Sequence, residues 1–209
     1  MRTTVITKEN QDTLTPTSVL ADLLEGNNRF VEAKNESVDY LAQVKQTIEG
    51  QFPKAIVLSC IDSRVPVELI FDQSIGDIFV ARVAGNFENV DILGSMEYSC
   101  KVAGSKIVLV LGHESCGAVK AACDGVELGN ITEMLSKITP AVKLAATQVD
   151  GEANSSNKEM VAKTVENNAL LTMDRIREKS PILKEMEDNG EIKIVGGIYH
   201  LSTGKVEVL

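Results

Sequence analysis

The stretch that decides the fold is Ala55-Ile56-Val57-Leu58-Ser59-Cys60-Ile61-Asp62-Ser63-Arg64. Its first four residues are all apolar, which is typical of a strand covered on both faces, as in a parallel sheet between helices. A thiol, a carboxylate and a guanidinium follow at every second position, on Cys60, Asp62 and Arg64. Three reactive side chains at the exit of a buried strand indicate a functional site.

A second stretch repeats this organisation. The apolar run 107–111 is followed directly by Gly112-His113-Glu114-Ser115-Cys116-Gly117. Because the carboxyl ends of neighbouring parallel strands meet at one edge of a sheet, we expect the side chains after both runs to come together. Cys60, His113 and Cys116 would then offer two thiolates and an imidazole, a set that Zn2+ accepts at a catalytic site with its fourth position left to water. Cys116 also lies where a helix is expected to begin, and the helix dipole there should lower the pKa of its thiol.

The remaining pattern predicts an α/β fold with a mainly parallel central β-sheet flanked by helices. A third apolar run covers 77–81, and the segment 89–104 has the helical spacing of a crossover between parallel strands. Helices are expected to begin at Thr15-Pro16, at Asp39 and near Asn130, and Gly26 should weaken the first of them. A C-terminal hairpin-like strand pair is expected over 191–209. We expect one domain, 1–209, with an N-terminal helical arm over 1–50 and an α/β zinc core over 51–209.

Bulk properties exclude several classes of protein. The 209 residues are 44% hydrophobic and 24% charged, the composition of an ordinary globular chain. The net charge of -9 gives no field that would attract a nucleic acid. No run of about 18 apolar residues and no signal-peptide core occur, so we expect no membrane partner and a cytoplasmic location. Four cysteines are too few for a disulfide framework, which favours reduced thiolates.

Three stretches make the sequence resemble the β-class carbonic anhydrases. They are Cys60-Ile61-Asp62-Ser63-Arg64, Gly76-Asp77-Ile78-Phe79-Val80-Ala81-Arg82-Val83-Ala84-Gly85-Asn86, and Gly112-His113-Glu114-Ser115-Cys116-Gly117. The resemblance implies that Cys60, His113 and Cys116 bind zinc and that Asp62 and Arg64 form a catalytic dyad. It also implies that Gln51 donates an amide hydrogen bond to the substrate, and that Phe79 and Tyr98 line a CO2 pocket shared with a second subunit of a homodimer or higher oligomer.

The chemistry expected of such a site is reversible hydration of CO2 to bicarbonate and a proton, by attack of zinc-bound hydroxide. Asp62 would accept a hydrogen bond from that hydroxide, and Arg64 would hold Asp62 ionised through a bidentate pair. The family also contains a closed arrangement in which the aspartate binds zinc and displaces the water, and the sequence is compatible with either.

Other interpretations of the same residues remain open. The site would also suit a CS2 or COS hydrolase, or a non-catalytic zinc-stabilised or thiol-sensing protein closed by Asp62. Asp62 and Arg64 alone could be a structural ion pair. We interpret Cys100 and Cys123 as core residues, Arg82 as a salt-bridge residue, and His200 as a strand-end or interface residue.

Overall fold

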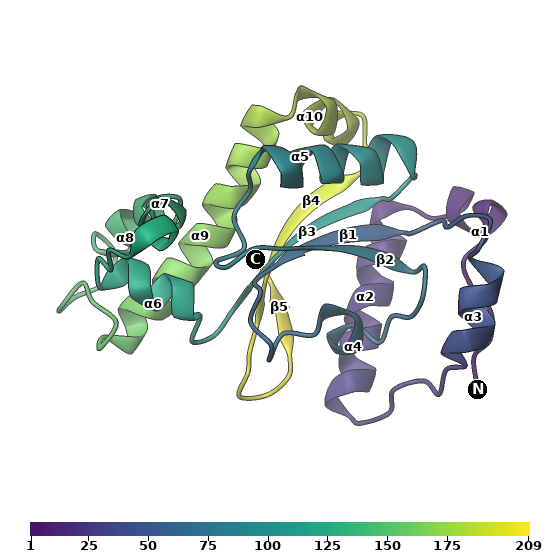
Figure 1. Ribbon diagram of the computed structural model, residues 1–209, viewed down its shortest axis with the longest axis horizontal. Coiled ribbons are helices and arrows are strands. Elements are labelled where there is room, and N and C mark those ends of the chain that lie inside the picture. Colours follow the sequence, from purple (N-terminus) through teal and green to yellow (C-terminus); the bar gives the residue numbers. More distant parts are fainter.

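A computed structural model describes residues 1–209 and contains a single five-stranded sheet in the order β2-β1-β3-β4-β5 (Figure 1). The strands are β1 Ala55–Ser59, β2 Ile78–Arg82, β3 Ile107–His113, β4 Lys193–Tyr199 and β5 Val206–Val208. The first four are parallel, and β5 pairs antiparallel with β4. The predicted α/β class, its mainly parallel sheet and the C-terminal strand pair are therefore confirmed.

Helices cover both faces of this sheet. They are α1 Lys8–Asp12, α2 Pro16–Val31, α3 Tyr40–Gln46, α4 Val67–Ile70, α5 Val90–Glu97 with its continuation η1 Tyr98–Val102, α6 Gly117–Cys123, α7 Gly129–Ser136, α8 Thr139–Ala145, α9 Lys158–Lys179 and α10 Pro181–Asp188. Figure 1 shows α2 and α4 on one side of the sheet and α5, α9 and α10 on the other. None of these helices is long and apolar enough to cross a membrane.

The alternation of side chains along each strand builds two separate cores. Ile56 and Leu58 of β1 belong to the larger buried cluster, which includes residues of α9 and α10. Ala55 and Val57 of the same strand belong to the smaller cluster, which includes Val19 and Leu23 of α2. The unbroken apolar run in β1 is explained by this arrangement, because both of its faces are covered.

The strand order has a topological switch point between β1 and β3. The chain passes from β1 outward to β2 through α4, then returns across β1 to β3 through α5, and these two helices belong to opposite layers. Connections that leave neighbouring strands on opposite faces open a crevice at the carboxyl ends of those strands. The two segments rich in reactive side chains lie at the carboxyl ends of these two strands, β1 and β3.

Three local predictions need correction. Gly26 does not interrupt α2, which continues from Pro16 to Val31. The helix packs so closely there that a Cβ on residue 26 would lie 1.9 Å from the carbonyl oxygen of Phe71, so the position requires glycine. The helix expected to begin with a cap at Asn130 starts at Gly129, and its N-cap, Leu128, makes no side-chain cap bond. Asp39 caps α3, as predicted. The apolar residues predicted to form its buried side, Leu41, Val44 and Ile48, are exposed to solvent instead, and Gln43 is buried.

Candidate metal centre

The three predicted metal ligands lie together at the carboxyl ends of β1 and β3. Cys60 follows the last residue of β1, His113 ends β3, and Cys116 is the N-cap of α6. Their ligand atoms all lie within 4.8 Å of one another, and all three residues are buried. The two sulfur atoms are 3.9 Å apart. Residues separated by more than fifty positions are thus brought into one cluster by the neighbouring placement of two strands.

The imidazole of His113 is oriented toward this cluster. Its Nδ1 donates to the backbone oxygen of Glu114 over 2.9 Å, so the other ring nitrogen carries the free lone pair. That nitrogen, Nε2, is buried and has no hydrogen-bond partner. A buried nitrogen with no partner is costly unless something binds it. Together with two sulfur atoms it forms a donor set that fits a borderline-soft divalent metal such as zinc.

The two thiols differ in their affinity for protons. A hydrogen bond from Cys116 stabilises the thiolate of Cys60 and lowers the pKa of Cys60 to about 4. The same interaction, together with burial, raises the pKa of Cys116. The backbone N–H groups at the helix start do lower the pKa of Cys116, as expected, but in the protein without metal they are outweighed by the proton that the two close thiols share and by burial. A bound divalent cation would remove this difference, since its charge favours the thiolate form of both cysteines.

The other two cysteines do not belong to this site. Cys100 and Cys123 lie in the larger hydrophobic core, as predicted. Burial raises the pKa of Cys100 to about 12, and Cys123 donates to the hydroxyl of Thr164.

Asp62 and Arg64 form a bidentate pair at the edge of the cluster. Arg64 Nε lies 3.0 Å from Asp62 Oδ1, and Arg64 Nη2 lies 2.7 Å from Asp62 Oδ2. The Arg64 backbone N–H also donates to Oδ1 over 2.9 Å. These bonds from Arg64 lower the pKa of Asp62 to about 2. Oδ2 lies 3.9 Å from His113 Nε2, which places an ionised carboxylate beside the nitrogen that would bind the metal.

Arg82 holds this segment from the neighbouring strand. Its Nε donates to the carbonyl oxygen of Cys60 over 2.9 Å, and its Nη2 donates to that of Asp62 over 2.6 Å. It makes no salt bridge, so the interpretation of Arg82 as a salt-bridge residue is wrong. Sequence reasoning missed this role because β1 and β2 must first be paired, with Ser59 opposite Arg82, before the contact can be seen.

A backbone group supplies the remaining contact to the cluster. The N–H of Gly85 donates to Cys60 Sγ over 3.4 Å. No side-chain pattern could have identified this donor. Its only sequence signal is the pair Gly85-Asn86 after β2, which is typical of a turn.

The predicted substrate-binding residues are not brought to the metal ligands of their own chain. Phe79 belongs to the edge strand β2 and Tyr98 begins η1, and their ring centroids lie 6.2 Å apart. Gln51 is exposed and precedes β1, so the five residues of that strand, about 16 Å in length, lie between it and Cys60. A single copy of the chain therefore brings together the predicted metal ligands and the predicted dyad, but not the predicted substrate contacts.

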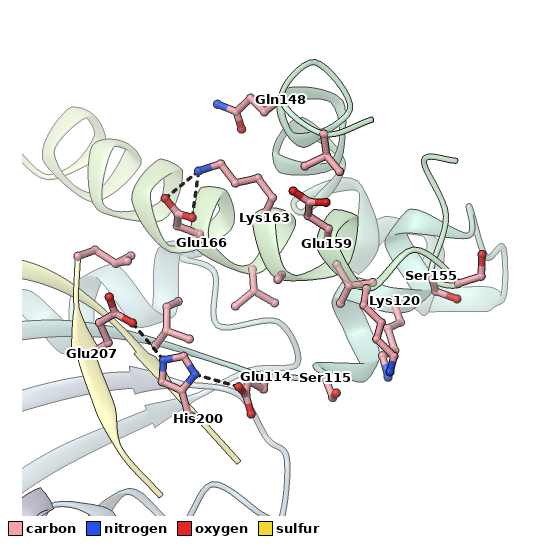
Figure 2. A pocket seen from close by; sticks show the side chains of 18 residues that line it. Glu114, Ser115, Lys120, Gln148, Ser155, Glu159, Lys163, Glu166, His200 and Glu207 are labelled. Atoms are coloured by element: carbon pink, nitrogen blue, oxygen red, sulfur yellow. Dashed lines mark hydrogen bonds and ion pairs between the residues drawn. The ribbon is translucent and has the colours of Figure 1, made fainter. Parts of the chain in front are cut away.

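A cavity of about 940 Å3 lies next to the segment between His113 and Cys116, and none of the three predicted ligands lines it. Figure 2 shows the ring of His200 between the carboxylates of Glu114 and Glu207. Glu114 also accepts the backbone N–H of Ser202 over 3.1 Å. These bonds attach the segment between His113 and Cys116 to the turn that follows β4. His200 directly follows the last residue of β4, so it lies at a strand end, as predicted.

Fold and site together define a class: α/β proteins with a buried Cys-His-Cys group, suited to a metal ion, at a switch point of the sheet. Residues 55–206 match the family model described as carbonic anhydrase. The chain is 34% identical to carbonic anhydrase 2 of Mycobacterium tuberculosis over 91% of each chain. Among solved structures, a Coccomyxa β-carbonic anhydrase superposes with a TM-score of 0.71 at 26% identity, covering 91% of this chain and 86% of that one. A tetrameric β-carbonic anhydrase from Sordaria macrospora, 22% identical, shares the fold with a TM-score of 0.73 over 92% and 97% of the two chains.

The chain belongs to the β-carbonic anhydrases, the lyases that interconvert CO2 and bicarbonate. The family resemblance predicted from three short stretches is therefore confirmed over most of the chain.

Proposed function

We propose that the protein catalyses the reversible hydration of CO2 at a zinc centre held by Cys60, His113 and Cys116. The observation that carries this proposal is the buried, unpartnered Nε2 of His113 beside two sulfur atoms, all within 4.8 Å. When bound, zinc supplies the Lewis acidity that ionises water near neutral pH and so provides the nucleophile for CO2. The chain supplies the ligands, the dyad and the shape of the site.

Asp62 acts in this proposal as a fixed hydrogen-bond acceptor. With a pKa of about 2 it stays ionised at neutral pH, so its Oδ2 accepts a hydrogen bond from the attacking water and orients it. A carboxylate of such low proton affinity cannot store the product proton, which must leave toward solvent. Arg64 keeps both carboxylate oxygens engaged, and this contact supports the open arrangement over one in which Asp62 binds the metal.

We further propose that a second copy of the chain completes the substrate pocket. Tyr98 and Val102 expose large apolar surfaces on η1. Tyr98 also lies close to Phe79 of β2, which is an edge strand of the sheet. Gln51, Phe79 and Tyr98, which lie away from the ligands of their own chain, would then serve the metal centre of the partner copy. Exposed apolar surface and an unpaired strand edge are both commonly buried when two copies of a chain associate. The tetrameric assembly of the Sordaria relative supports association in this fold.

Removal of the metal tests the proposed function directly. Dialysis of the purified protein against a chelator should abolish CO2 hydration, and one equivalent of Zn2+ per chain should restore it. The measurement is stopped-flow CO2 hydration together with metal analysis of the same samples. Zinc-loaded protein that turns over COS or CS2 but not CO2 would favour the related hydrolase. Loaded protein that is inactive on all three substrates at every pH would favour a non-catalytic zinc protein.

Association should respond to a charge placed on the proposed interface. Val102 is 71% exposed, and a Val102→Glu variant should lower both the mass seen by analytical ultracentrifugation and the rate of CO2 hydration. Leu128, 63% exposed on the loop before α7, provides a matched control, and Leu128→Glu should leave both unchanged. A Val102→Glu variant that keeps the mass and rate of the unmodified protein would place the interface elsewhere.

A further inference from the structure

The hydrogen bond to Cys60 Sγ depends on a tight turn after β2. The N–H of Asn86 donates to the carbonyl of Val83 over 3.0 Å, and Gly85 has a φ of +85° at the third position of this turn. That combination matches a type II turn, in which the third residue requires a positive φ. The central peptide of the turn carries the Gly85 N–H that reaches the sulfur. A flip of this peptide would turn the donor away from Cys60.

The turn is held from outside by one side chain. Asn168, in the middle of α9, donates from Nδ2 to the carbonyl oxygen of Gly85 over 2.8 Å. Asn168 is 1% exposed and lies 83 positions away in the sequence. Space at the turn is also closed, since a Cβ on residue 85 would lie 2.4 Å from Cδ1 of Ile138. The conformation of Gly85 is thus set by contacts from α9 and from the start of α8.

The same helix also holds the far end of this segment. The carboxylate of Glu88, which is buried, accepts from Arg175 Nε and from Lys179 Nζ, each over 2.8 Å. Asn168, Arg175 and Lys179 lie on one face of α9, because positions i, i+7 and i+11 recur on the same side of a helix. One face of α9 therefore fixes the chain at both Gly85 and Glu88.

We propose that Asn168 is a positioning residue for the metal centre: it fixes the turn so that the Gly85 N–H donates to the sulfur of Cys60. This inference rests on the proposed function, in which Cys60 is a ligand. Hydrogen bonds to a ligand atom set both its orientation and the electron density that it offers to the metal. The N–H of Gly85 withdraws density from the sulfur and holds it in place. Asn168 touches neither the substrate nor the metal and acts only through its bond to the carbonyl oxygen of Gly85, the residue whose N–H reaches the sulfur.

The test compares two neighbouring asparagines of α9. Asn167 is also buried, at 3% exposure, but it donates to Gln148 Oε1 over 2.8 Å and does not touch the turn. Asn168→Ala and Asn167→Ala would be loaded with Co2+, whose thiolate-to-metal charge-transfer bands report the sulfur directly. Exchange of the Gly85 amide hydrogen would be followed by NMR in the metal-free proteins.

Asn168→Ala should move the charge-transfer band to longer wavelength, because a sulfur without its hydrogen bond gives up an electron more easily. The Gly85 amide should exchange at least about 10-fold faster, and CO2 hydration should fall by about 10-fold. Asn167→Ala should match the unmodified protein in all three measurements. Asn168→Leu, which keeps the bulk but not the donor, should repeat the result and guards against a folding defect caused by the cavity.

Two outcomes would overturn the inference. In the first, the Asn168 variants have the same charge-transfer band and the same Gly85 exchange rate as the unmodified protein. In the second, Asn167→Ala changes both as much as Asn168→Ala does, which would mean that Asn168 contributes only to the packing of α9. Failure of the proposed function is distinguishable from these. In that case the unmodified protein itself would show no thiolate-to-cobalt band or no CO2 hydration.

Discussion

Replacement of Cys60 by serine is expected to lower kcat/KM for CO2 hydration by roughly 10³-fold or more, and to leave the purified protein without stoichiometric metal. Cys60 is the thiol whose pKa is lowered to about 4, so it offers the thiolate to an incoming cation. A serine hydroxyl ionises far less readily and is a harder ligand that zinc does not select. The His113 nitrogen and the second sulfur would remain, but two ligands hold zinc weakly.

The measurements are metal analysis of the purified variant and stopped-flow CO2 hydration. Cys123→Ser is the matched control, because Cys123 is also buried and its contact with the Thr164 hydroxyl can be kept by serine. That control should retain both metal and activity. If Cys60→Ser kept one zinc per chain and the activity of the unmodified protein, the metal centre would have to be sought elsewhere.

Replacement of Asp62 by asparagine is expected to lower kcat by about 100-fold while the metal content stays unchanged. The substitution keeps the size of the side chain but removes its charge. It also puts an amide donor where a hydrogen bond must be accepted, and it breaks the fork with Arg64. Arg64→Lys should give a smaller loss, because lysine keeps the positive charge but cannot make the planar two-point contact. A variant Asp62→Asn with normal kcat would rule out the dyad.

The dependence on pH provides a second readout of the same pair. The pKa of Asp62 is depressed to about 2, against about 3.9 in an unfolded chain. A depressed pKa means that this pair stabilises the fold fully above about pH 4 and loses its effect as the pH falls toward 2. The unmodified protein should therefore lose more stability than Asp62→Asn between these two values in acid unfolding. At neutral pH Asp62 is always ionised, so its titration cannot produce a pH dependence of the rate there.

Much of the fold and the ligand set could be predicted because they are encoded locally. Apolar runs at 55–58 and 107–111 indicate strands buried on both faces, whatever the rest of the chain does. Thr15 with Pro16, and Asp39, cap their helices as predicted, because capping depends only on residues a few positions apart. The apolar surface on and after α3 could not be assigned a partner, since periodicity shows that a helix has an apolar side but not what covers it.

The sequence by itself determined the strands, the family and the kinds of side chain that meet a metal, because these depend on residue type and on short-range spacing. Only the tertiary structure decided how those side chains act together. It brought two thiols close enough to share one proton, gave Arg82 two carbonyl oxygens in place of a salt bridge, and set the Gly85 N–H on Cys60 with an asparagine 83 positions from that glycine. Such contacts join segments that are far apart in the sequence and meet only after α9 has packed against the sheet. Patterns of neighbouring residues therefore cannot predict them.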